Sequence, residues 1–316
     1  MSETMKAVRI HQYGDPSVLL YEDAPKPVPA AGEVLVKVRA VGINPVDWNT
    51  RAGKGIAGLL KNPFPFIDGW DISGVIEALG EGATKFKVGD EVFGMVRFPQ
   101  VGSAYAEYVA APQTDLSLKP KNIDFVEAAA YPLVALTAWQ ALFEAGNLSS
   151  GERLLIQGAA GGVGHVAVQI AKWKGAYVIG TGSTNNIDFL RELGVDEVVD
   201  YTTTRFEDVV APVDVVFNCI GNPEIINRSL NVIKAGGRFV SIAGGADQAE
   251  AEKRQIKASG ILVRPVESHL DAIADLIQQG KLKIVVTKVF DLKDMDKAHA
   301  FAESRELRRG KIVLKV

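Results

Sequence analysis

A glycine-rich turn in the middle of the chain combines the residues best suited to bind a charged ligand. Residues 153–164 read Arg-Leu-Leu-Ile-Gln-Gly-Ala-Ala-Gly-Gly-Val-Gly, an apolar run that leads directly into the turn. The apolar residues that follow recur with the 3.6-residue period of a helix. A strand, turn and helix in this order direct several backbone N–H groups and the positive end of the helix dipole at one point. This pattern predicts that a dinucleotide pyrophosphate binds at the turn, at Ala160, Gly161, Gly162, Val163 and Gly164.

The turn departs from the G-x-G-x-x-G pattern of dinucleotide-binding folds at one position. Ala159 stands where the first glycine belongs, whereas Gly161 and Gly164 hold the other two places. Glycine-rich turns between strands and helices also occur without a ligand, as tight turns with close packing. The turn alone leaves both interpretations open, and the sequence that follows favours the ligand.

The end of the next predicted strand, residues 177–182, indicates which dinucleotide binds. A carboxylate at this place, roughly 20 residues after the turn, binds the ribose 2′-hydroxyl of NAD. This chain has no acid there and instead has hydroxyl and amide side chains, at Ser183, Thr184, Asn185 and Asn186. Because a carboxylate would repel a 2′-phosphate and these donors can hold one, we predict NADPH as the cofactor.

Composition excludes several classes of protein. The 316 residues are enough for two domains, and the net charge of −3 provides no basic surface for nucleic acid. No apolar run approaches the roughly 20 residues that span a bilayer, and the first residues contain no apolar core of a signal peptide. The single cysteine rules out an internal disulfide and is typical of a reducing compartment. We therefore expect a cytoplasmic protein with neither nucleic acid nor membrane as a partner.

The first third of the chain is rich in strand patterns. Residues 33–41 alternate between apolar and polar side chains, and further strands are predicted at 69–79 and at the end of 86–94. This is the character of an antiparallel, barrel-like domain. An alanine-rich helical stretch follows at 125–145 and is interrupted at Pro132.

Strands and helices alternate through the second half, which predicts a doubly wound parallel sheet in an α/β protein. The predicted strands are 153–158, 177–182, 197–201, 213–220, 238–243 and 261–266. A helix at about 269–279 and a final strand at 311–316 end the chain, and we expect this strand to return to the first domain. The predicted domains are therefore 1–122 together with 267–316, and 123–266.

Several short motifs stand in a recognisable order along nearly the whole chain. They are Gly42-Ile43-Asn44-Pro45-Val46-Asp47-Trp48, Gly69-Trp70-Asp71-Ile72-Ser73-Gly74, Lys87-Val88-Gly89-Asp90-Glu91-Val92, Leu136-Thr137-Ala138-Trp139, the glycine turn and Gly310-Lys311-Ile312-Val313-Leu314. In order and spacing the chain resembles the zinc-free medium-chain dehydrogenases/reductases of the quinone oxidoreductase and enone (alkenal/one) oxidoreductase type. The resemblance implies a GroES-like antiparallel β-barrel domain, a Rossmann domain and a homodimer that pairs through the edge of the nucleotide sheet, at 241–243 and 261–266.

Zinc can be tested from the residues, because catalytic zinc needs three protein ligands such as cysteine and histidine. Zinc-bearing relatives have a cysteine where this chain has Asn44, and Gly-His-Glu where it has Gly69-Trp70-Asp71. The four histidines of this chain are scattered, and one cysteine cannot form a four-cysteine zinc lobe. We predict no metal site.

Without a Lewis acid, a conjugated acceptor is easier to reduce than a simple ketone. Hydride from NADPH would leave an enolate or a hydroquinone anion, for which hydrogen-bond donors suffice. The predicted substrate is therefore a small quinone or α,β-unsaturated carbonyl compound. The alternative is an NADP(H)-binding protein with little turnover, crystallin-like or regulatory, which the glycine turn supports equally well.

Three residues are predicted to carry the chemistry, and each has a structural alternative. By resemblance Asn44 lies near the nicotinamide and bonds the cofactor or the substrate oxygen; otherwise it closes a turn. Asp47 orients this loop or caps a helix, and Trp48 lines the substrate site or packs in the core. Relatives often have lysine where this chain has Asn49 and Asn185, so we expect weak discrimination between NADPH and NADH.

Further cofactor contacts are predicted by resemblance and at the ends of the parallel strands. Thr137 is expected to meet the nicotinamide carboxamide, or else to bond its own helix. Tyr201 is expected at the adenosine phosphate end, or else it is only a strand-end aromatic residue. The loops after two strands should border the cofactor at Cys219, Ile220, Ile242, Ala243 and Gly244, with Cys219 packing rather than reacting. Lys311 is expected to reach the cofactor from the tail, whereas Arg308 and Arg309 are solvated charges.

Overall fold

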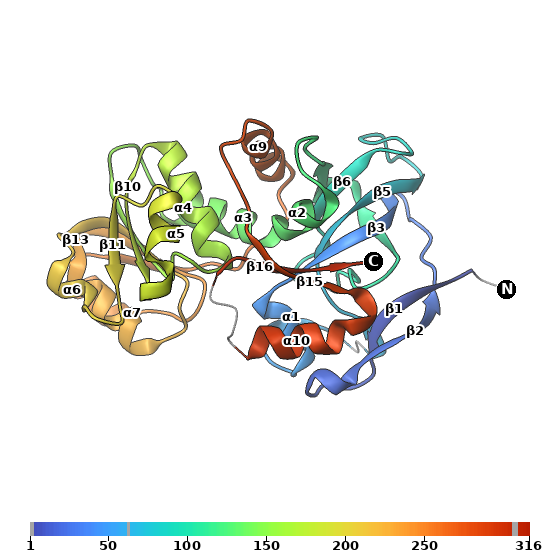
Figure 1. Cartoon of the computed structure of the whole chain (residues 1–316), viewed down its shortest axis with the longest axis horizontal. Coiled ribbons are helices and arrows are strands. Elements are labelled where there is room, and N and C mark those ends of the chain that lie inside the picture. Colours follow the sequence, from blue (N-terminus) through green and yellow to red (C-terminus); the bar gives the residue numbers. More distant parts are fainter. Residues whose placement is uncertain (1–2, 62–63, 305–308) are drawn as a thin grey trace.

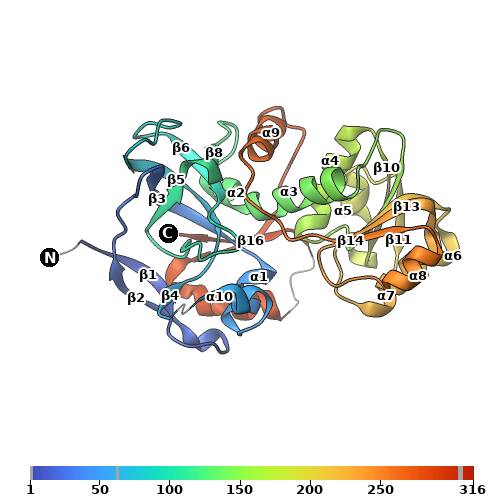
Figure 2. The ribbon, with the colours of Figure 1, turned by 180° about the vertical axis from the view of Figure 1, so that it is seen from behind.

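The computed structural model describes residues 3–61, 64–304 and 309–316. Two sheets lie at opposite ends of the molecule, with helices α3 (Pro132–Trp139) and α9 (Glu267–Gln278) between them (Figure 1). The view from behind shows the same arrangement, with β1 and β2 at the outer end of the strand-rich half (Figure 2). Among the described residues, no helix has both the length and the apolar character needed to cross a membrane.

A mainly antiparallel sheet forms the strand-rich half, with one parallel pair, β15 and β16. Its strands run in the order β15-β16-β3-β5-β6-β8, with β7 paired to β3, and a smaller sheet has the order β2-β1-β4. The bounds are β1 (Thr4–Ile10), β2 (Leu19–Pro25), β3 (Glu33–Ile43), β4 (Phe66–Ile67), β5 (Asp71–Leu79), β6 (Glu91–Met95), β7 (Tyr108–Pro112), β8 (Leu116–Leu118), β15 (Val286–Asp291) and β16 (Lys311–Lys315). This arrangement confirms the predicted GroES-like antiparallel barrel.

Strand β3 shows why the apolar alternation predicts this sheet. Val34, Val36 and Val38 are buried in the barrel core, while Lys37 is half-buried and Arg39 is exposed. Alternate side chains of a strand point to opposite faces, so the apolar face fills the core. The predicted strands at 33–41, 69–79 and 86–94 correspond to β3, β5 and β6, with ends that differ by a few residues.

A parallel sheet forms the other half, in the order β11-β10-β9-β12-β13-β14. On β9, Leu155 packs in a cluster with α6, α7 and α8, whereas Leu154 and Ile156 pack with α3 and α4. Helices therefore cover both faces, which confirms the doubly wound Rossmann-type sheet. The bounds are β9 (Arg153–Gln157), α4 (Gly162–Lys174), β10 (Tyr177–Gly182), α5 (Ile187–Glu192), β11 (Glu197–Asp200), α6 (Phe206–Val209), β12 (Val213–Asn218), α7 (Pro223–Ser229), β13 (Ile233–Ser241), α8 (Gln248–Lys253) and β14 (Lys257–Gly260).

The last strand of this sheet corrects one prediction. The strand expected at 261–266 is wrong, because β14 spans Lys257–Gly260 and pairs with Arg238–Ser241 of β13. An edge strand has an open side, so β14 can be polar and largely exposed. The apolar residues that suggested a strand, Ile261 and Val263, instead pack on the cluster that covers the sheet. Strand β13 also begins earlier than expected, at Ile233.

The helical stretch between the two halves breaks where the sequence predicts. Helix α2 (Phe125–Ala130) ends before Tyr131, and Pro132 occupies the first turn of α3, where its missing N–H costs nothing. Helix α2 contacts β3, β5 and β16, whereas α3 contacts α4 and α9. These two helices therefore connect the barrel to the parallel sheet.

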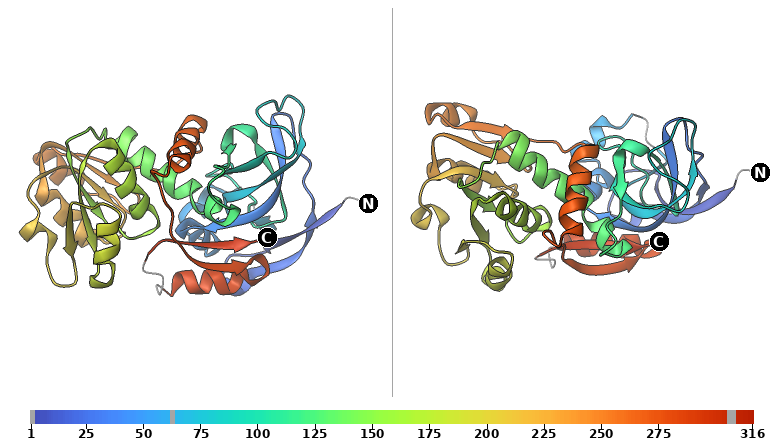
Figure 3. Two further views of the ribbon diagram at one scale, coloured as in Figure 1. Left: turned by 45° about the horizontal axis from the view of Figure 1, so that its top comes forward. Right: turned by 90° about the horizontal axis from the view of Figure 1, so that it is seen from above.

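The tail returns to the barrel, as predicted. Strand β16 pairs antiparallel with β3, so that Ile312 lies opposite Ile43, and α10 (Met295–Glu303) packs on the same side as α1 (Pro45–Arg51). Two further views show β16 ending within the strand-rich half (Figure 3). The domain boundaries at 122/123 and 266/267 stay predictions.

Candidate active site

The glycine turn has the geometry of an anion-binding helix start. Gly161 is the N-cap of α4, and no side chain caps the helix, so the first N–H groups of α4 are left to a ligand or to solvent. Gly164 lets the helix approach the strand: a Cβ there would lie 2.2 Å from the Gly158 carbonyl oxygen. Gly158 itself has a φ of +76°, the left-handed region that favours glycine. Ala159, at the place of the first motif glycine, is fully buried, so this departure is accommodated by packing.

The ends of the neighbouring parallel strands meet beside this turn. The Cys219 N–H donates to the Gln157 carbonyl oxygen at 3.2 Å, and the Ile242 N–H donates to that of Asn218 at 3.2 Å. A Cβ at Gly158 would lie 3.1 Å from Ile220. The structure therefore brings the predicted strand-end residues to one edge of the sheet, where this fold binds ligands.

Cys219 packs against the apolar cluster under the sheet. Burial raises the pKa of its thiol above the usual range, so the thiol stays protonated at neutral pH. A protonated thiol is a poor nucleophile. That Cys219 packs rather than reacts stays a prediction, which its partly buried position favours.

A carboxylate from another strand lies beside the loop expected to hold the 2′-phosphate, and its nearness could not be seen from the order of the sequence. Thr184 Oγ1 donates to Asp200 Oδ2 at 2.6 Å, and the Thr202 hydroxyl donates to Asp200 Oδ1 at 2.6 Å. These side-chain hydrogen bonds hold the pKa of Asp200 below its usual range, so the group is ionised. Asp200 ends β11, which pairs with β10, and this pairing places it next to the loop. The hydroxyl of Thr184 is therefore committed to a carboxylate rather than free for a phosphate.

A pocket of about 160 Å³ lies at the same edge of the sheet. It is lined by Gln157, Thr181, Tyr201, Thr204, Arg205, Phe206, Ile220, Ile225 and Arg228. Tyr201 is half exposed at its rim, and Arg228 is paired with Glu207 at 2.6 Å. An apolar slot with an aromatic side chain at the end of β11 suits a flat ring system.

Asn44 lies between a buried cation and a buried carboxylate. Its Nδ2 donates to Asp71 Oδ2 at 2.8 Å, and the Lys311 ammonium donates to its Oδ1 and, at 2.7 Å, to the Ile43 carbonyl oxygen. Lys311 and Asp71 are 3.9 Å apart and are both buried. Burial raises the pKa of Asp71 to about 6, against the opposing effect of Lys311. The amide of Asn44 is thus fixed in orientation, with one Nδ2 hydrogen not used by Asp71.

Asp47 and Trp48 follow Asn44 on α1. Asp47 is the third residue of that helix, and its Oδ2 accepts the Asn44 backbone N–H at 2.8 Å in a capping box. The capping and the orienting interpretations of Asp47 are therefore the same contact. Trp48 is half-buried against the barrel core, and the side chain of Asn49 donates to the Pro45 carbonyl oxygen.

Thr137 lies in the middle of α3 and is buried, yet its hydroxyl has no hydrogen-bond partner among the described residues. The alternative in which it bonds its own helix is not what the structure shows. A buried polar atom without a partner is costly and calls for a ligand. Thr137 thus fits the nicotinamide carboxamide that the resemblance implies.

The tail residues lie close to the glycine turn. The Gly310 N–H donates to the Ala160 carbonyl oxygen at 3.3 Å, and a Cβ at Gly162 would lie 3.4 Å from the Lys311 side chain. The guanidinium of Arg309 lies 5.5 Å from the Phe189 ring centroid, and Arg309 is exposed, as predicted for a solvated charge. Arg308 lies outside the described residues. The contact of Lys311 with a cofactor stays a prediction, since its observed contacts are with Asn44 and Ile43.

Sequence reasoning missed the buried polar groups that surround Asn44. Tyr105 donates to Asp47, His299 lies 3.3 Å from Tyr105 Oη, and Arg51 lies 3.1 Å from His299 Nδ1. Asp68 is buried beside them. The only signal in the sequence is an acid at each end of Asp68-Gly69-Trp70-Asp71, inside an otherwise apolar segment. Their partners come from distant segments and cannot be read from spacing.

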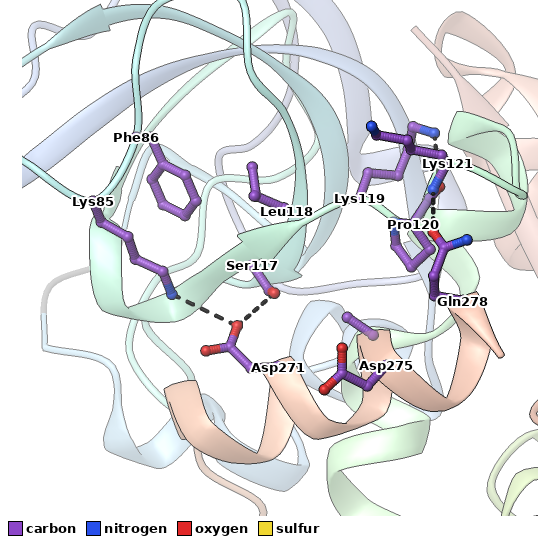
Figure 4. Close-up of a pocket in the computed structure, with 11 residues that line it drawn as sticks. Lys85, Phe86, Ser117, Leu118, Lys119, Pro120, Lys121, Asp271, Asp275 and Gln278 are labelled. Atoms are coloured by element: carbon purple, nitrogen blue, oxygen red, sulfur yellow. Dashed lines mark hydrogen bonds and ion pairs between the residues drawn. The ribbon is translucent and has the colours of Figure 1, made fainter.

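A second pocket lies elsewhere, between β8 and α9, and has a volume of about 440 Å³ (Figure 4). None of the predicted site residues lines it. Some of its polar groups are paired with one another or with neighbours: Lys85 lies 2.9 Å from Glu267, and the Ser117 hydroxyl donates to Asp271 at 2.6 Å. Among the described residues, no group of three or more His, Cys, Asp or Glu side chains could hold a metal ion.

Two family models each match part of the chain. Residues 30–121 match the family described as alcohol dehydrogenase GroES-like domain, and residues 193–314, which run from the parallel sheet into the tail, match the family described as zinc-binding dehydrogenase.

Individual relatives cover most of the chain. A 2-methylene-furan-3-one reductase of Solanum lycopersicum is 35% identical over 89% of this chain and 71% of its own length. A chloroplastic NADPH-dependent alkenal/one oxidoreductase of Arabidopsis thaliana is 35% identical over 89% of this chain and 72% of its own. The solved structure of the quinone oxidoreductase from Coxiella burnetii has a TM-score of 0.92 at 35% identity and covers 99% of this chain and 100% of its own. The chain therefore belongs to the medium-chain dehydrogenase/reductase superfamily of NAD(P)H-using oxidoreductases, within its quinone oxidoreductase and alkenal/one oxidoreductase type.

Proposed function

We propose that this chain is a zinc-independent reductase that transfers hydride from NADPH to a conjugated acceptor, either a quinone or an α,β-unsaturated carbonyl compound. The observation that supports this most is the Asn44 side chain, held between Lys311 and Asp71. An amide donor stands where the zinc-bearing relatives have a cysteine, with one buried positive charge beside it.

The residues present fit a dinucleotide. The uncapped start of α4 suits the pyrophosphate, the pocket at Tyr201 and Ile220 suits the adenine ring, and the unpartnered hydroxyl of Thr137 suits the carboxamide. When bound, the cofactor would supply the hydride. Everything else in the reaction depends on how the protein binds, orients and stabilises the substrate.

The chemistry of the acceptor explains why donors suffice. Reduction of a conjugated acceptor places negative charge on an oxygen, and preorganised donors stabilise such an oxygen without a metal. Asn44 has one Nδ2 hydrogen that Asp71 does not use, and the ammonium of Lys311 polarises the same amide from behind. We assign Asn44 to the substrate oxygen or the nicotinamide, Asp47 to the orientation of its loop and Trp48 to the wall of the substrate site.

The preference for NADPH over NADH is proposed to be small. Ser183, Thr184, Asn185 and Asn186 offer donors rather than an acid, and an alkenal/one relative is NADPH-dependent by name. Against this, the ionised carboxylate of Asp200 accepts a hydrogen bond from Thr184 and would repel a 2′-phosphate. A loop with donors and one nearby negative charge should bind both cofactors, and NADPH somewhat more tightly than NADH.

A cytoplasmic location and a homodimer complete the proposal. The predicted pairing edge now falls on β14, at Lys257–Gly260, instead of 261–266. An exposed edge strand with free N–H and C=O groups is a natural site for pairing with a second copy.

The test is turnover. The purified protein is mixed with NADPH and, in turn, a small enone, a benzoquinone and a naphthoquinone, while the absorbance of the reduced nicotinamide is followed; NADH is the comparison. Reduction of an enone or a quinone supports the proposal and selects between the two. If NADPH binds and no acceptor is reduced, the proposal is wrong, and a binding or regulatory role replaces it.

A further inference from the structure

A buried chain of hydrogen bonds runs from the tail helix α10 to the loop that holds Asn44. Arg51 contacts His299 Nδ1 at 3.1 Å, His299 Nε2 lies 3.3 Å from Tyr105 Oη, and Tyr105 donates to Asp47 Oδ2. Asp47 Oδ2 also accepts the Asn44 backbone N–H at 2.8 Å. All of these side chains are at most 2% exposed.

The direction of this chain follows from the chemistry of its members. An arginine side chain has donors only, so His299 Nδ1 must accept and the ring must carry its proton on Nε2. That proton points at Tyr105, whose own hydroxyl proton points at Asp47. Burial lowers the pKa of His299 to about 3, with a further contribution from Arg51, so the ring is neutral. Because arginine does not give up its proton, the chain cannot conduct protons and is instead a fixed set of donors aimed at Asp47.

The charges around Asp47 do not balance pairwise. Arg51 is paired with Glu303 at 2.9 Å, and Lys311 lies 3.9 Å from Asp71. Within the described ranges, neither Asp47 nor Asp68 forms an ion pair within 4 Å of a cationic nitrogen. Each also has one buried oxygen without a hydrogen-bond partner, Asp47 Oδ1 and Asp68 Oδ2, although Asp68 Oδ1 accepts the Gly69 N–H at 2.8 Å. Two buried carboxylates therefore each lack one donor, and Tyr105 contacts both segments: its backbone N–H donates to the Asp68 carbonyl oxygen at 3.1 Å, and its hydroxyl donates to Asp47.

We propose that Asp47 and Asp68 hold a single proton between them. The chain of donors from Arg51, His299 and Tyr105 keeps the negative charge on Asp47. The ionised Asp47 in turn positions Asn44. One proton on Asp68 supplies a donor for Asp47 and removes a second buried charge. Asp47 is the ionised member because its Oδ2 accepts two donors, whereas Asp68 accepts one. Neither residue needs to touch substrate or cofactor, so both are positioning residues.

Electrostatics of the pair agree with the geometry. Burial raises the pKa of Asp68 well above its usual value, the charge of Asp47 raises it further, and the Gly69 N–H and Arg51 oppose the rise. Burial also raises the pKa of Asp47, while Tyr105, the Asn44 N–H and Lys311 oppose the rise and Asp71 adds to it. The proton belongs to the pair as a unit, as in other close carboxyl pairs.

Loss of this proton should disturb the position of Asn44 and so lower the rate of reduction. The predicted effect on the rate therefore rests on the proposed function. At alkaline pH two adjacent negative charges would repel, and the Asp47 contact that holds Asn44 would loosen. The folded pair also binds a proton that unfolded carboxyl groups release near pH 4, so the free energy of unfolding should fall as pH rises from about 4 towards the pKa of the folded pair.

The first experiment needs neither cofactor nor turnover. Infrared spectra of the whole protein at neutral pH are recorded for wild type, Asp68→Asn, Asp47→Asn and the control Asp115→Asn. Asp115 is a buried aspartate of the same barrel whose Oδ2 accepts the Arg97 N–H at 2.7 Å. The carbonyl band of a protonated carboxyl group should appear in wild type minus Asp68→Asn, whereas wild type minus Asp47→Asn should show the loss of a carboxylate, because Asp47 is the ionised member. Wild type minus Asp115→Asn should show carboxylate bands only. If wild type minus Asp68→Asn also shows only carboxylate bands, the pair holds no proton and the inference is wrong.

The second experiment separates positioning from folding. Asparagine at 68 imitates the neutral acid and keeps a donor for Asp47, so the alkaline fall of kcat/KM seen in wild type should disappear in Asp68→Asn. Asn at 47 removes the charged acceptor, so Asp47→Asn should lose about tenfold in kcat/KM at neutral pH. Equal profiles for wild type and Asp68→Asn would overturn the proposal.

Tyr105→Phe covers the case in which Asp68→Asn does not fold. It removes one donor from Asp47, so the pair should keep its proton to higher pH and the alkaline fall should move upward. An unmoved fall in Tyr105→Phe contradicts the inference. A protein that shows the infrared band but reduces no acceptor leaves the shared proton standing and refutes only the proposed function.

Discussion

Replacing Asp200 by asparagine is expected to raise the preference for NADPH. The carboxylate lies 2.6 Å from the Thr184 hydroxyl, in the loop where the 2′-phosphate is proposed to bind. Asparagine has nearly the same shape and removes the negative charge. The altered hydrogen bonds to Thr184 and Thr202 should change the binding of both cofactors to a similar extent. Only NADPH carries the 2′-phosphate that the Asp200 charge repels.

The size of the effect follows from the distance. The Thr184 hydroxyl already donates to Asp200, so a phosphate held by the neighbouring donors of this loop would have its nearest oxygen about 5 Å from the carboxylate. Two unit charges 4 Å apart in water change an equilibrium about fivefold. The phosphate stands somewhat further away, which lowers the interaction energy by about a fifth, but its charge of about −1.5 to −2 raises it by more, to about 1.2–1.7 kcal/mol. The ratio of kcat/KM for NADPH to that for NADH should therefore rise about tenfold in Asp200→Asn.

Steady-state kinetics with both cofactors and one acceptor measure this ratio, at low and at high salt. The gain should shrink at high salt, since exposed charges are screened beyond about 10 Å at 0.1 M and more strongly above it. Asp188→Asn is the matched control: its side chain is 89% exposed on the next helix and paired with Arg191 at 3.0 Å. If Asp200→Asn leaves the ratio unchanged, or if Asp188→Asn raises it equally, the 2′-phosphate does not bind at Thr184.

Three further changes test other parts of the site. Lys311→Met removes the ammonium that faces Asp71 and should lower the free energy of unfolding by about 3 kcal/mol in denaturant titrations; adding Asp71→Asn should restore most of it. Thr137→Val deletes a buried hydroxyl without a partner, so Tm should hold while calorimetric titration shows NADPH binding about fivefold more weakly. Gly164→Ala places a Cβ 2.2 Å from a carbonyl oxygen and should cost about 2 kcal/mol in thermal unfolding, whereas Gly162→Ala, with 3.4 Å to its nearest neighbour, should not.

The elements that could be predicted from sequence are those whose pattern is local. Strands β3 and β9 bury apolar residues at the spacing that their burial requires, and Pro132 breaks the helix because it lacks an N–H. Strand β14 could not be predicted this way. It is an edge strand with the sequence Lys-Ala-Ser-Gly, held by backbone bonds to β13, so its side chains carry no apolar signal. The apolar residues after it belong to a helix-covered surface instead.

The site residues likewise fall into those that a local sequence pattern predicts and those that it does not. The glycine turn and the strand-end residues follow from one local pattern, and the structure brings them together at one edge. Asp200 differs, because it approaches Thr184 only through the pairing of β11 with β10, 16 positions along the chain. His299 is further still from Arg51 in sequence, 248 positions. A partner selected by tertiary packing leaves no trace in residue spacing, and only the burial of a polar side chain hints that one exists.

The return of the tail to the barrel brings the charge of Lys311 into the proposed substrate site. Asn44 is neutral and Trp70 packs on Phe98, with its indole N–H donating to the Gln100 carbonyl oxygen, so Asp71 is left as a buried carboxylate that needs a cation. The ammonium of Lys311 supplies that charge because β16 pairs with β3 directly beside Asn44. One ammonium and one amide can stabilise an oxygen that is already becoming an anion, yet they polarise an isolated ketone far less than a divalent metal does. This is why we propose, as the substrate class, an acceptor whose reduction delocalises charge onto oxygen.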